Sequence, residues 1–266
     1  MILSYGTLLS RKPLSLSIGK VRKPTISDIE DVGFESFYLY ESFLKMTPND
    51  FYTDLDKEGA EVFWNHLSEK EKEECTMYDA ICRNPKLQAI YCELFTFFFE
   101  IECVKFVDNV FFLLKKDIDL TDSENKEVAE NISGIIFKDT FDSVLFILQQ
   151  VCAINDDMET PIEEMKFKNK MAKEMYLKMR EAERKNKKSK AANPDLQLEN
   201  IISAVSNRHP SINPLNVHDL TIYQLLDSFN RLMANAIYEI DSTRVSVWGD
   251  EKKTFNASLW YKNHFK

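Results

Sequence analysis

Residues that could carry out chemistry occur in this chain, but they do not fall at the spacings that enzymes and metal sites use. No two histidines are arranged as H-E-x-x-H or lie four residues apart, and no serine lies in a G-x-S-x-G turn. The Gly19-Lys20 pair lacks the upstream glycine of a phosphate-binding loop. The sequence therefore predicts no catalytic residue, no cofactor and no metal, and it favours a protein that is not an enzyme.

The cysteines are also not spaced for chemistry. They are odd in number, and no pair forms C-x-x-C or a Cys/His zinc pattern. We interpret them as reduced thiols that pack as small core residues in a cytoplasmic protein. They are Cys75, Cys82, Cys92, Cys103 and Cys152.

An acidic cluster surrounds the helix start expected after residue 155. Carboxylates at this density could bind a metal ion, but they also complement the positive end of a helix dipole, and we favour the second interpretation. The cluster comprises Asp156, Asp157, Glu159, Glu163 and Glu164.

The most distinctive feature is a basic helix expected over residues 166–190. This segment holds eleven basic residues against three glutamates, a net charge of +8, whereas the whole chain carries −9. A solvated helix face, nucleic-acid binding and protein binding could each explain the charge. The acidic remainder of the chain makes nucleic acid the less favoured partner.

A methionine stripe on the same helix favours a protein partner. Met171, Met175 and Met179 are four residues apart and share one face. Flexible methionine side chains suit adaptive docking, although core packing would explain the same spacing. The predicted partner-binding residues are Met171, Met175, Met179, Lys178, Arg180 and Arg184.

Composition predicts the fold class. The 266 residues include only 6 glycines and 8 prolines, so tight turns should be few. Hydrophobic residues make up 44% and charged residues 29%, as in a soluble globular protein. We expect a mainly α protein (α+β) with a small β-hairpin or sheet. Its parts would be residues 1–157 and 158–266, or a single compact domain.

Helix starts are marked by capping signals. Boxes are expected at Ser27–Glu30, at Ser68–Glu71 before a helix to about Cys82, and at Thr221–Gln224 before a helix to about Ile240. Phe34–Lys45 and the segment after Asn84-Pro85 are further helices.

Three short β segments are expected. Residues before Thr25 suggest one or two strands or an extended arm. Cys103–Leu114 predicts a hairpin around Asp108-Asn109, with a buried helix as the alternative, and Gly134–Phe137 predicts a further strand.

Aromatic residues in two places bear on packing. The apolar helix segment Leu94–Phe98 is either core or a contact surface. Trp248, Trp260 and Phe265 near the end of the chain are expected to pack rather than stay exposed. Neither a secretory signal nor a membrane span is indicated, because the most apolar run, Leu94–Phe99, is far shorter than a bilayer requires.

Two segments resemble a known group of proteins. Lys20–Phe51 (KVRKPTISDIEDVGFESFYLYESFLKMTPNDF) and Asn213–Asp250 (NPLNVHDLTIYQLLDSFNRLMANAIYEIDSTRVSVWGD) are similar to tail assembly chaperone-like proteins from tail gene clusters of tailed phages infecting Gram-positive bacteria. In that group a K-x-P-T-[LI] entry precedes a short acidic helix, and an L-[ST]-I-Y-Q helix lies near the end.

The resemblance implies a non-enzymatic protein. It would bind the tape-measure protein or tail-tube subunits in the host cytoplasm before assembly, presenting an apolar groove to them. Retention in the virion as a structural component is one alternative, and nucleic-acid binding through the basic helix is another.

Overall fold

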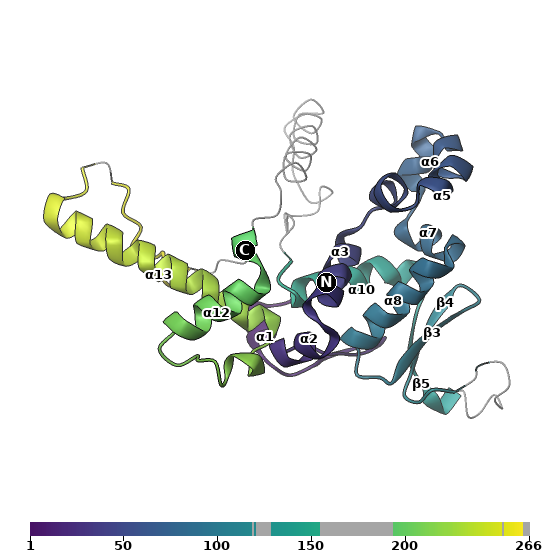
Figure 1. Cartoon of the computed structure of the whole chain (residues 1–266), viewed down its shortest axis with the longest axis horizontal. Coiled ribbons are helices and arrows are strands. Elements are labelled where there is room, and N and C mark those ends of the chain that lie inside the picture. The colour runs from purple at the N-terminus through teal and green to yellow at the C-terminus, as the bar shows by residue number, and fades with distance from the viewer. Residues whose placement is uncertain (119, 121–128, 155–193, 252, 263–266) are drawn as a thin grey trace. The chain divides into compact units, whose positions relative to one another are not determined.

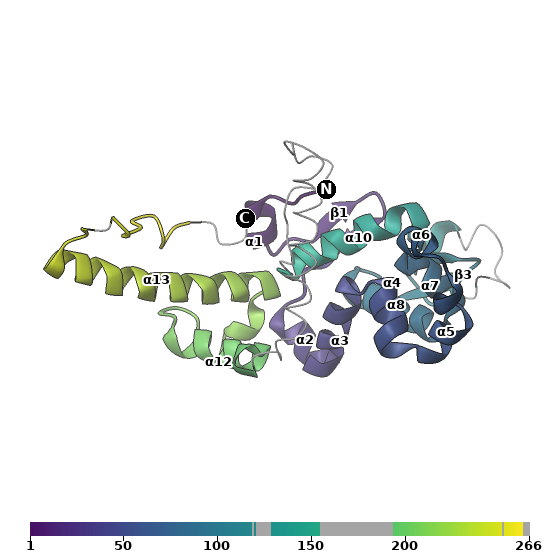
Figure 2. The same cartoon turned by 90° about the horizontal axis from the view of Figure 1, so that it is seen from above.

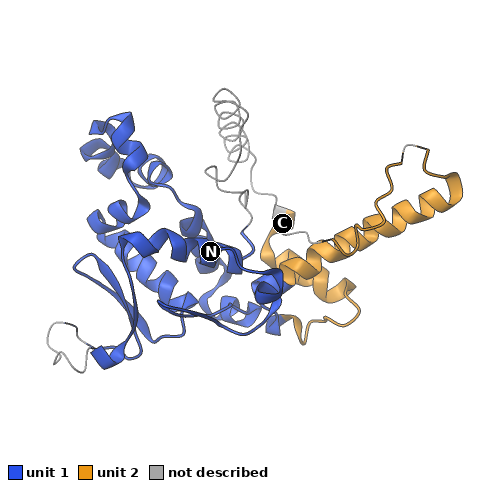
Figure 3. Cartoon of the chain, turned by 180° about the vertical axis from the view of Figure 1, so that it is seen from behind, with its two compact units in different colours: residues 1–154, 218–224 blue, residues 155–217, 225–266 orange. Residues whose placement is uncertain are grey.

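A computed structural model describes residues 1–118, 120, 129–154, 194–251 and 253–262 (Figure 1). The chain divides into two compact units (Figure 3). Unit 1 comprises Met1–Ile154 and His218–Gln224, and unit 2 comprises Asn155–Val217 and Leu225–Lys266. Of the described residues, 60% are helical and 11% are in strands or bridges, which confirms a mainly α fold with a small β element.

Unit 1 is built from short helices and two antiparallel sheets. Its helices are α1 (Tyr5–Leu9), α2 (Ile26–Val32), α3 (Phe34–Lys45), α4 (Pro48–Asp50), α5 (Lys57–Val62), α6 (Glu69–Glu74), α7 (Met77–Arg83), α8 (Pro85–Phe98) and α10 (Lys138–Val151). A π-helical turn η1 (Phe51–Leu55) and a 3-10 turn η2 (Trp64–His66) lie between them. A further 3-10 turn, η4 (Val217–Asp219), begins at the last residue of the first segment of unit 2 and continues into unit 1. The strands are β1 (Leu14–Leu16), β2 (Gly19–Val21), β3 (Cys103–Val107), β4 (Val110–Leu114) and β5 (Ile132–Ile136).

Unit 2 contains fewer described elements. They are a 3-10 turn η3 (Pro194–Leu196), helix α12 (Leu198–Arg208) and most of helix α13 (Ile222–Trp248), followed by an irregular tail. Helix α13 extends eight residues beyond the expected end at Ile240, since no glycine or proline interrupts it before Gly249.

The start of α2 corrects the sequence prediction. Thr25, not Ser27, is the N-cap: its hydroxyl accepts from Asp28 N at 3.2 Å, and the Asp28 carboxylate accepts from Thr25 N at 2.7 Å. The spacing T-x-x-D satisfies the same reciprocal pattern two residues earlier. Gly33, with φ +85°, ends α2 and separates it from α3.

The helix expected from Ser68 to about Cys82 is in fact two helices. The Ser68–Glu71 box starts α6 as predicted, but α6 ends at Glu74 and Cys75 is extended. A second box then forms, in which Thr76 accepts from Asp79 N and Asp79 accepts from Thr76 N, and α7 begins. A threonine placed three residues before an aspartate offers the backbone this alternative to a continuous helix.

The predicted hairpin is confirmed. Strands β3 and β4 pair from Cys103 with Leu114 to Val107 with Val110. Asp108 and Asn109 form the two-residue turn with φ +49° and +59°, the left-handed geometry that such a turn requires. Strand β5 adds to β4, which confirms a further strand near Gly134.

The core of unit 1 is aromatic. Phe95 of α8, Phe111 of β4 and Phe141 of α10 are fully buried, with ring centroids 5.1 Å (Phe95–Phe111) and 6.1 Å (Phe95–Phe141) apart in edge-to-face contacts. The buried hydroxyl of Tyr91 donates to the Phe43 carbonyl at 2.9 Å. The apolar segment Leu94–Phe98 is therefore core for the most part and not a contact surface.

One glycine in β5 permits a close backbone approach. A Cβ at Gly134 would lie 1.9 Å from the carbonyl oxygen of Ile18 in the turn between β1 and β2, whereas a Cβ at Gly6 would have no neighbour within 4 Å. The two sheets can approach this closely only because residue 134 has no side chain.

We predict that Gly134→Ala lowers the free energy of unfolding of unit 1 by about 2 kcal/mol or more, because two backbones must separate. The matched control is Gly6→Ala, which should be neutral or slightly stabilising in helix α1. Urea unfolding followed by circular dichroism measures both. Equal midpoints for the two variants would contradict the close contact.

Candidate functional site

A short antiparallel bridge joins the start of α2 to the start of α13. Thr25 and Thr221 pair directly. Both belong to unit 1, because this unit includes the segment His218–Gln224. The bridge has two backbone hydrogen bonds, from Ile26 N to the Leu220 carbonyl (2.9 Å) and from Ile222 N to the Pro24 carbonyl (3.0 Å). The two segments that carry the phage-protein resemblance, 20–51 and 213–250, are thus bonded to each other.

Each bridged threonine also caps a helix. Thr221 N donates to the Gln224 side chain at 3.0 Å, and Gln224 N donates to the Thr221 hydroxyl at 3.2 Å, which confirms the predicted box. The Gln224 amide additionally donates to the Leu9 carbonyl at 2.7 Å. Because Thr221 is almost fully buried, the first turn of α13 is anchored inside unit 1.

Polar side chains reinforce this anchor. His218 Nδ1 lies 2.9 Å from a carboxylate oxygen of Glu30, and the Arg11 guanidinium donates to the Asp219 carbonyl. Nearby, buried Lys23 donates to the Ser10 carbonyl at 2.6 Å and to another carbonyl of α1, and burial lowers the pKa of its ammonium group. These contacts hold backbone segments together, and they explain the polar residues of this region structurally.

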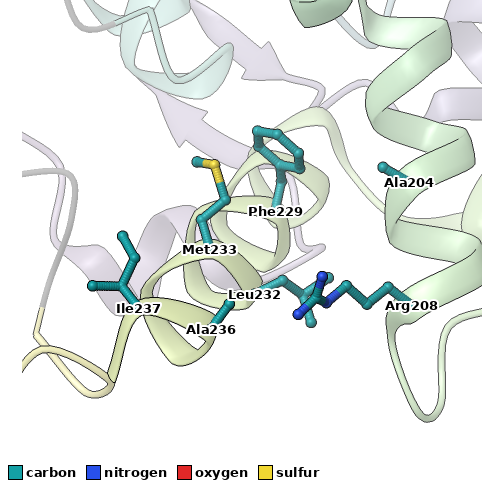
Figure 4. A pocket seen from close by; sticks show the side chains of 7 residues that line it. All are labelled: Ala204, Arg208, Phe229, Leu232, Met233, Ala236 and Ile237. Atoms are coloured by element: carbon teal, nitrogen blue, oxygen red, sulfur yellow. The ribbon is translucent and has the colours of Figure 1, made fainter. Parts of the chain in front are cut away.

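Unit 2 carries a pocket between α12 and α13 (Figure 4). It encloses about 370 Å³, the lower part of the range for ligand sites. Arg208 extends from α12 toward Leu232 of α13 (Figure 4). All residues of the lining are among those that the structure describes, and Arg208 is the one charged residue among them. The lining consists of Ala204, Arg208, Phe229, Leu232, Met233, Ala236 and Ile237.

The apolar lining continues as an exposed stripe along α13. Large apolar side chains recur at helical spacing toward the end of the helix and remain open to solvent. Their exposed fractions are 44% for Met233, 51% for Ile237, 69% for Ile240, 65% for Val247 and 76% for Trp248. Several exposed large apolar side chains on one helix are typical of an interaction surface.

The tail covers a different face of α13. After Gly249 the chain turns back along the helix (Figures 1 and 2), and the Phe255 ring packs on Tyr238 with centroids 5.6 Å apart. The Asp250 carboxylate accepts from Thr254 N (2.9 Å) and Phe255 N (3.0 Å), bonds that hold its pKa below the usual value. The turn therefore directs the tail away from the stripe.

This arrangement corrects the expectation for the last tryptophans. Trp248 and Trp260 were expected to pack, but they are 76% and 50% exposed. Phe255 occupies the packing position on α13 instead. Phe265 lies outside the described residues.

The residues predicted to bind a partner cannot be placed in the fold. Met171, Met175, Met179, Lys178, Arg180 and Arg184 lie outside the described residues, as does the acidic cluster at 156–164. Their assignment stays a prediction.

Sequence reasoning missed the stripe on α13, although a signal was present. Met233, Ile240 and Val247 are spaced by exact sevens, which indicates one helical face. Ending the expected helix at Ile240 removed Val247 and Trp248 from that face.

The pocket and the stripe fall in a region that matches a known family. Residues 185–264 match the YomV second domain. The family is phage-associated, and the match spans less than a third of the chain. Neither a curated protein nor a solved structure matches the chain.

Within the described part of the chain, the YomV second-domain region and unit 1 show no group of three His, Cys, Asp or Glu side chains that could hold a metal ion. All five cysteines have free thiols. No helix among the described residues is long and apolar enough to cross a bilayer.

We predict that the pocket of the YomV second-domain region binds an apolar fluorescent probe such as anilinonaphthalene sulfonate. Ala204→Phe should reduce probe fluorescence by about half or more, because the new ring fills a site of this size. The control is Ser203→Phe, which adds the same ring at an exposed neighbouring position outside the lining. Equal fluorescence for both variants would place the probe elsewhere.

Proposed function

We propose that this protein is a non-enzymatic tail assembly chaperone of a tailed phage, which binds the tape-measure protein or tail-tube subunits before assembly. The observation that carries the proposal is the apolar pocket between α12 and α13, open to solvent and continuous with the stripe on α13. The phage-associated family match covers this region. The resemblance of segments 20–51 and 213–250 to tail assembly chaperone-like proteins supplies the role.

The pocket suits a helical partner. An amphipathic helix docks by inserting side chains at positions i, i+3, i+4 and i+7 into an apolar groove. The lining of the pocket offers Phe229 and Met233 as adaptable apolar walls, and Arg208 at one side can pair with an acidic residue of the partner. Tape-measure proteins are long helical proteins, so such a groove would shield one of their apolar faces until the tail is built.

The composition of the pocket supports binding over catalysis. The lining is fully described, and Arg208 is its one charged residue; a guanidinium donates hydrogen bonds but has no acceptor atom. Phe229, Leu232 and Ile237 have no group that transfers a proton or attacks a substrate. We therefore propose a site that excludes water from an apolar ligand without transforming it.

Co-expression tests the proposal. We expect the tape-measure protein encoded by the same phage to be insoluble alone and at least about fivefold more soluble with this chain, because binding removes it from the aggregating pool by mass action. Ala204→Phe should remove most of the gain, and Ser203→Phe should retain it. The tail-tube subunit serves as the second bait.

Two results would contradict the proposal. The first is equal solubility of both baits with and without the chain. The second is full solubilisation by Ala204→Phe together with loss by Ser203→Phe, which would place the binding surface outside the pocket.

Nucleic acid is not the partner that we propose for the basic segment 166–190. Its charge of +8 lies on a chain that carries −17 elsewhere, so an extended polyanion would meet repulsion beyond the segment. We predict duplex DNA binding that is weak and falls by about 10³-fold between about 50 and 200 mM salt. Fluorescence anisotropy measures it, and submicromolar affinity at the higher salt would favour a nucleic-acid-binding protein instead.

A further inference from the structure

The exposed stripe on α13 has the spacing of a coiled-coil seam. Met233, Ile240 and Val247 recur every seven residues, and Ala236 and Thr243 follow the first two by three residues. This is the a/d pattern of a heptad repeat. Met233, Ile240 and Val247 have exposed fractions from 44% to 69%, so a seam about 21 Å long lies open.

Charged residues flank this seam in a self-complementary way. With Ile240 at position a, Glu239 occupies position g and Arg244 occupies position e. Both side chains are exposed on the helix. The guanidinium of Arg244 contacts Asp241 of the same helix at 3.1 Å, and its further donors leave it able to bind a second carboxylate.

We propose that two copies of this chain pair through α13 in a parallel, in-register coiled coil. In that arrangement Glu239 of each copy lies opposite Arg244 of the other, which forms the ion pair twice. An antiparallel pair would place g opposite g and e opposite e, and these oppositely charged residues would not meet.

The alternative register is disfavoured by charge. In the alternative register, Ile237 and Arg244 replace Ala236 and Thr243 as the seam positions beside Met233, Ile240 and Val247. The two Arg244 side chains would then be buried opposite each other at the centre of the interface, which is costly for like charges. In the proposed register Ile237, at position e, flanks the seam and widens its apolar contact, while Arg244 stays at the edge.

Among the described residues, helix α12 lies beside only the earlier end of this surface, where Met233 and Ala236 also line the pocket. The tail packs through Phe255 on Tyr238, on another face of the helix. Helix α12 contributes Ala204 and Arg208 to the pocket at the earlier end of the stripe. Ile240, Val247 and Trp248 are the most exposed large apolar residues of α13.

The pairing does not depend on the proposed function, and its test needs no phage partner. Analytical ultracentrifugation of the full chain from about 1 to 200 µM should show a monomer–dimer equilibrium. Ile240→Asp should weaken dimerisation by at least about 100-fold, because it buries two like charges in the seam. The matched control, Leu215→Asp, alters a residue that is 92% exposed and lies outside the helix.

Charge reversal tests the parallel orientation. Glu239→Arg and Arg244→Glu should each weaken the dimer about tenfold, since each replaces two attractive pairs with two repulsive ones. Mixing the two single variants should restore association, because every pair across the seam is then opposite in charge. All these positions are exposed, and circular dichroism verifies that each variant folds.

Three results would overturn the proposal: a monomer throughout the concentration series, a dimer that Ile240→Asp leaves unchanged, or single charge variants that do not associate when mixed. If the chain stays monomeric but Ile240→Asp lowers solubilisation of the tape-measure protein, the seam belongs to that partner. The pocket variant Ala204→Phe, which lies on α12, reports separately on the proposed function.

Discussion

The backbone pairing between Thr25 and Thr221 is the constraint on which the rest of the structure depends. It joins the entry to α2 with the entry to α13 by two hydrogen bonds, and each threonine also satisfies the first turn of its own helix. Both threonines lie in a region of unit 1 with little solvent access, where an unpaired amide would be costly. Closing such a long stretch of chain carries a large entropy cost, which these bonds and the burial around them offset.

This pairing divides helix α13 between two roles. Its first turn belongs to unit 1, and from Leu225 onward the helix belongs to unit 2. At the far end of the helix, the Asp250 turn directs Phe255 onto Tyr238. The helix therefore has one face on which the tail packs and another that stays exposed.

The proposed function rests on the exposed apolar face of α13 and not on reactive groups. The aromatic residues that could have formed a contact surface, Phe95 and Phe98, are fully buried in unit 1. The exposed apolar stripe of α13 lies in the region that matches a phage-associated domain. For the candidate site, the sequence predicts partner binding through a stripe at Met171, Met175 and Met179, which lie outside the described residues. It did not indicate the exposed Met233 and Ile240.

The sequence by itself determined the local structure: the turn at Asp108-Asn109, the boxes at Ser68 and Thr221, and the helix after Asn84-Pro85. Each depends on side chains and backbone groups within four residues of one another, so the pattern specifies the contact. Only the tertiary structure decided that Thr25 pairs with Thr221, that Phe98 is buried and that Trp248 is exposed. A helix pattern shows which residues share a face, but burial depends on a second element that packs against that face. The chain has several apolar helix faces, and the spacing of their residues does not show which face is buried by another element and which stays exposed.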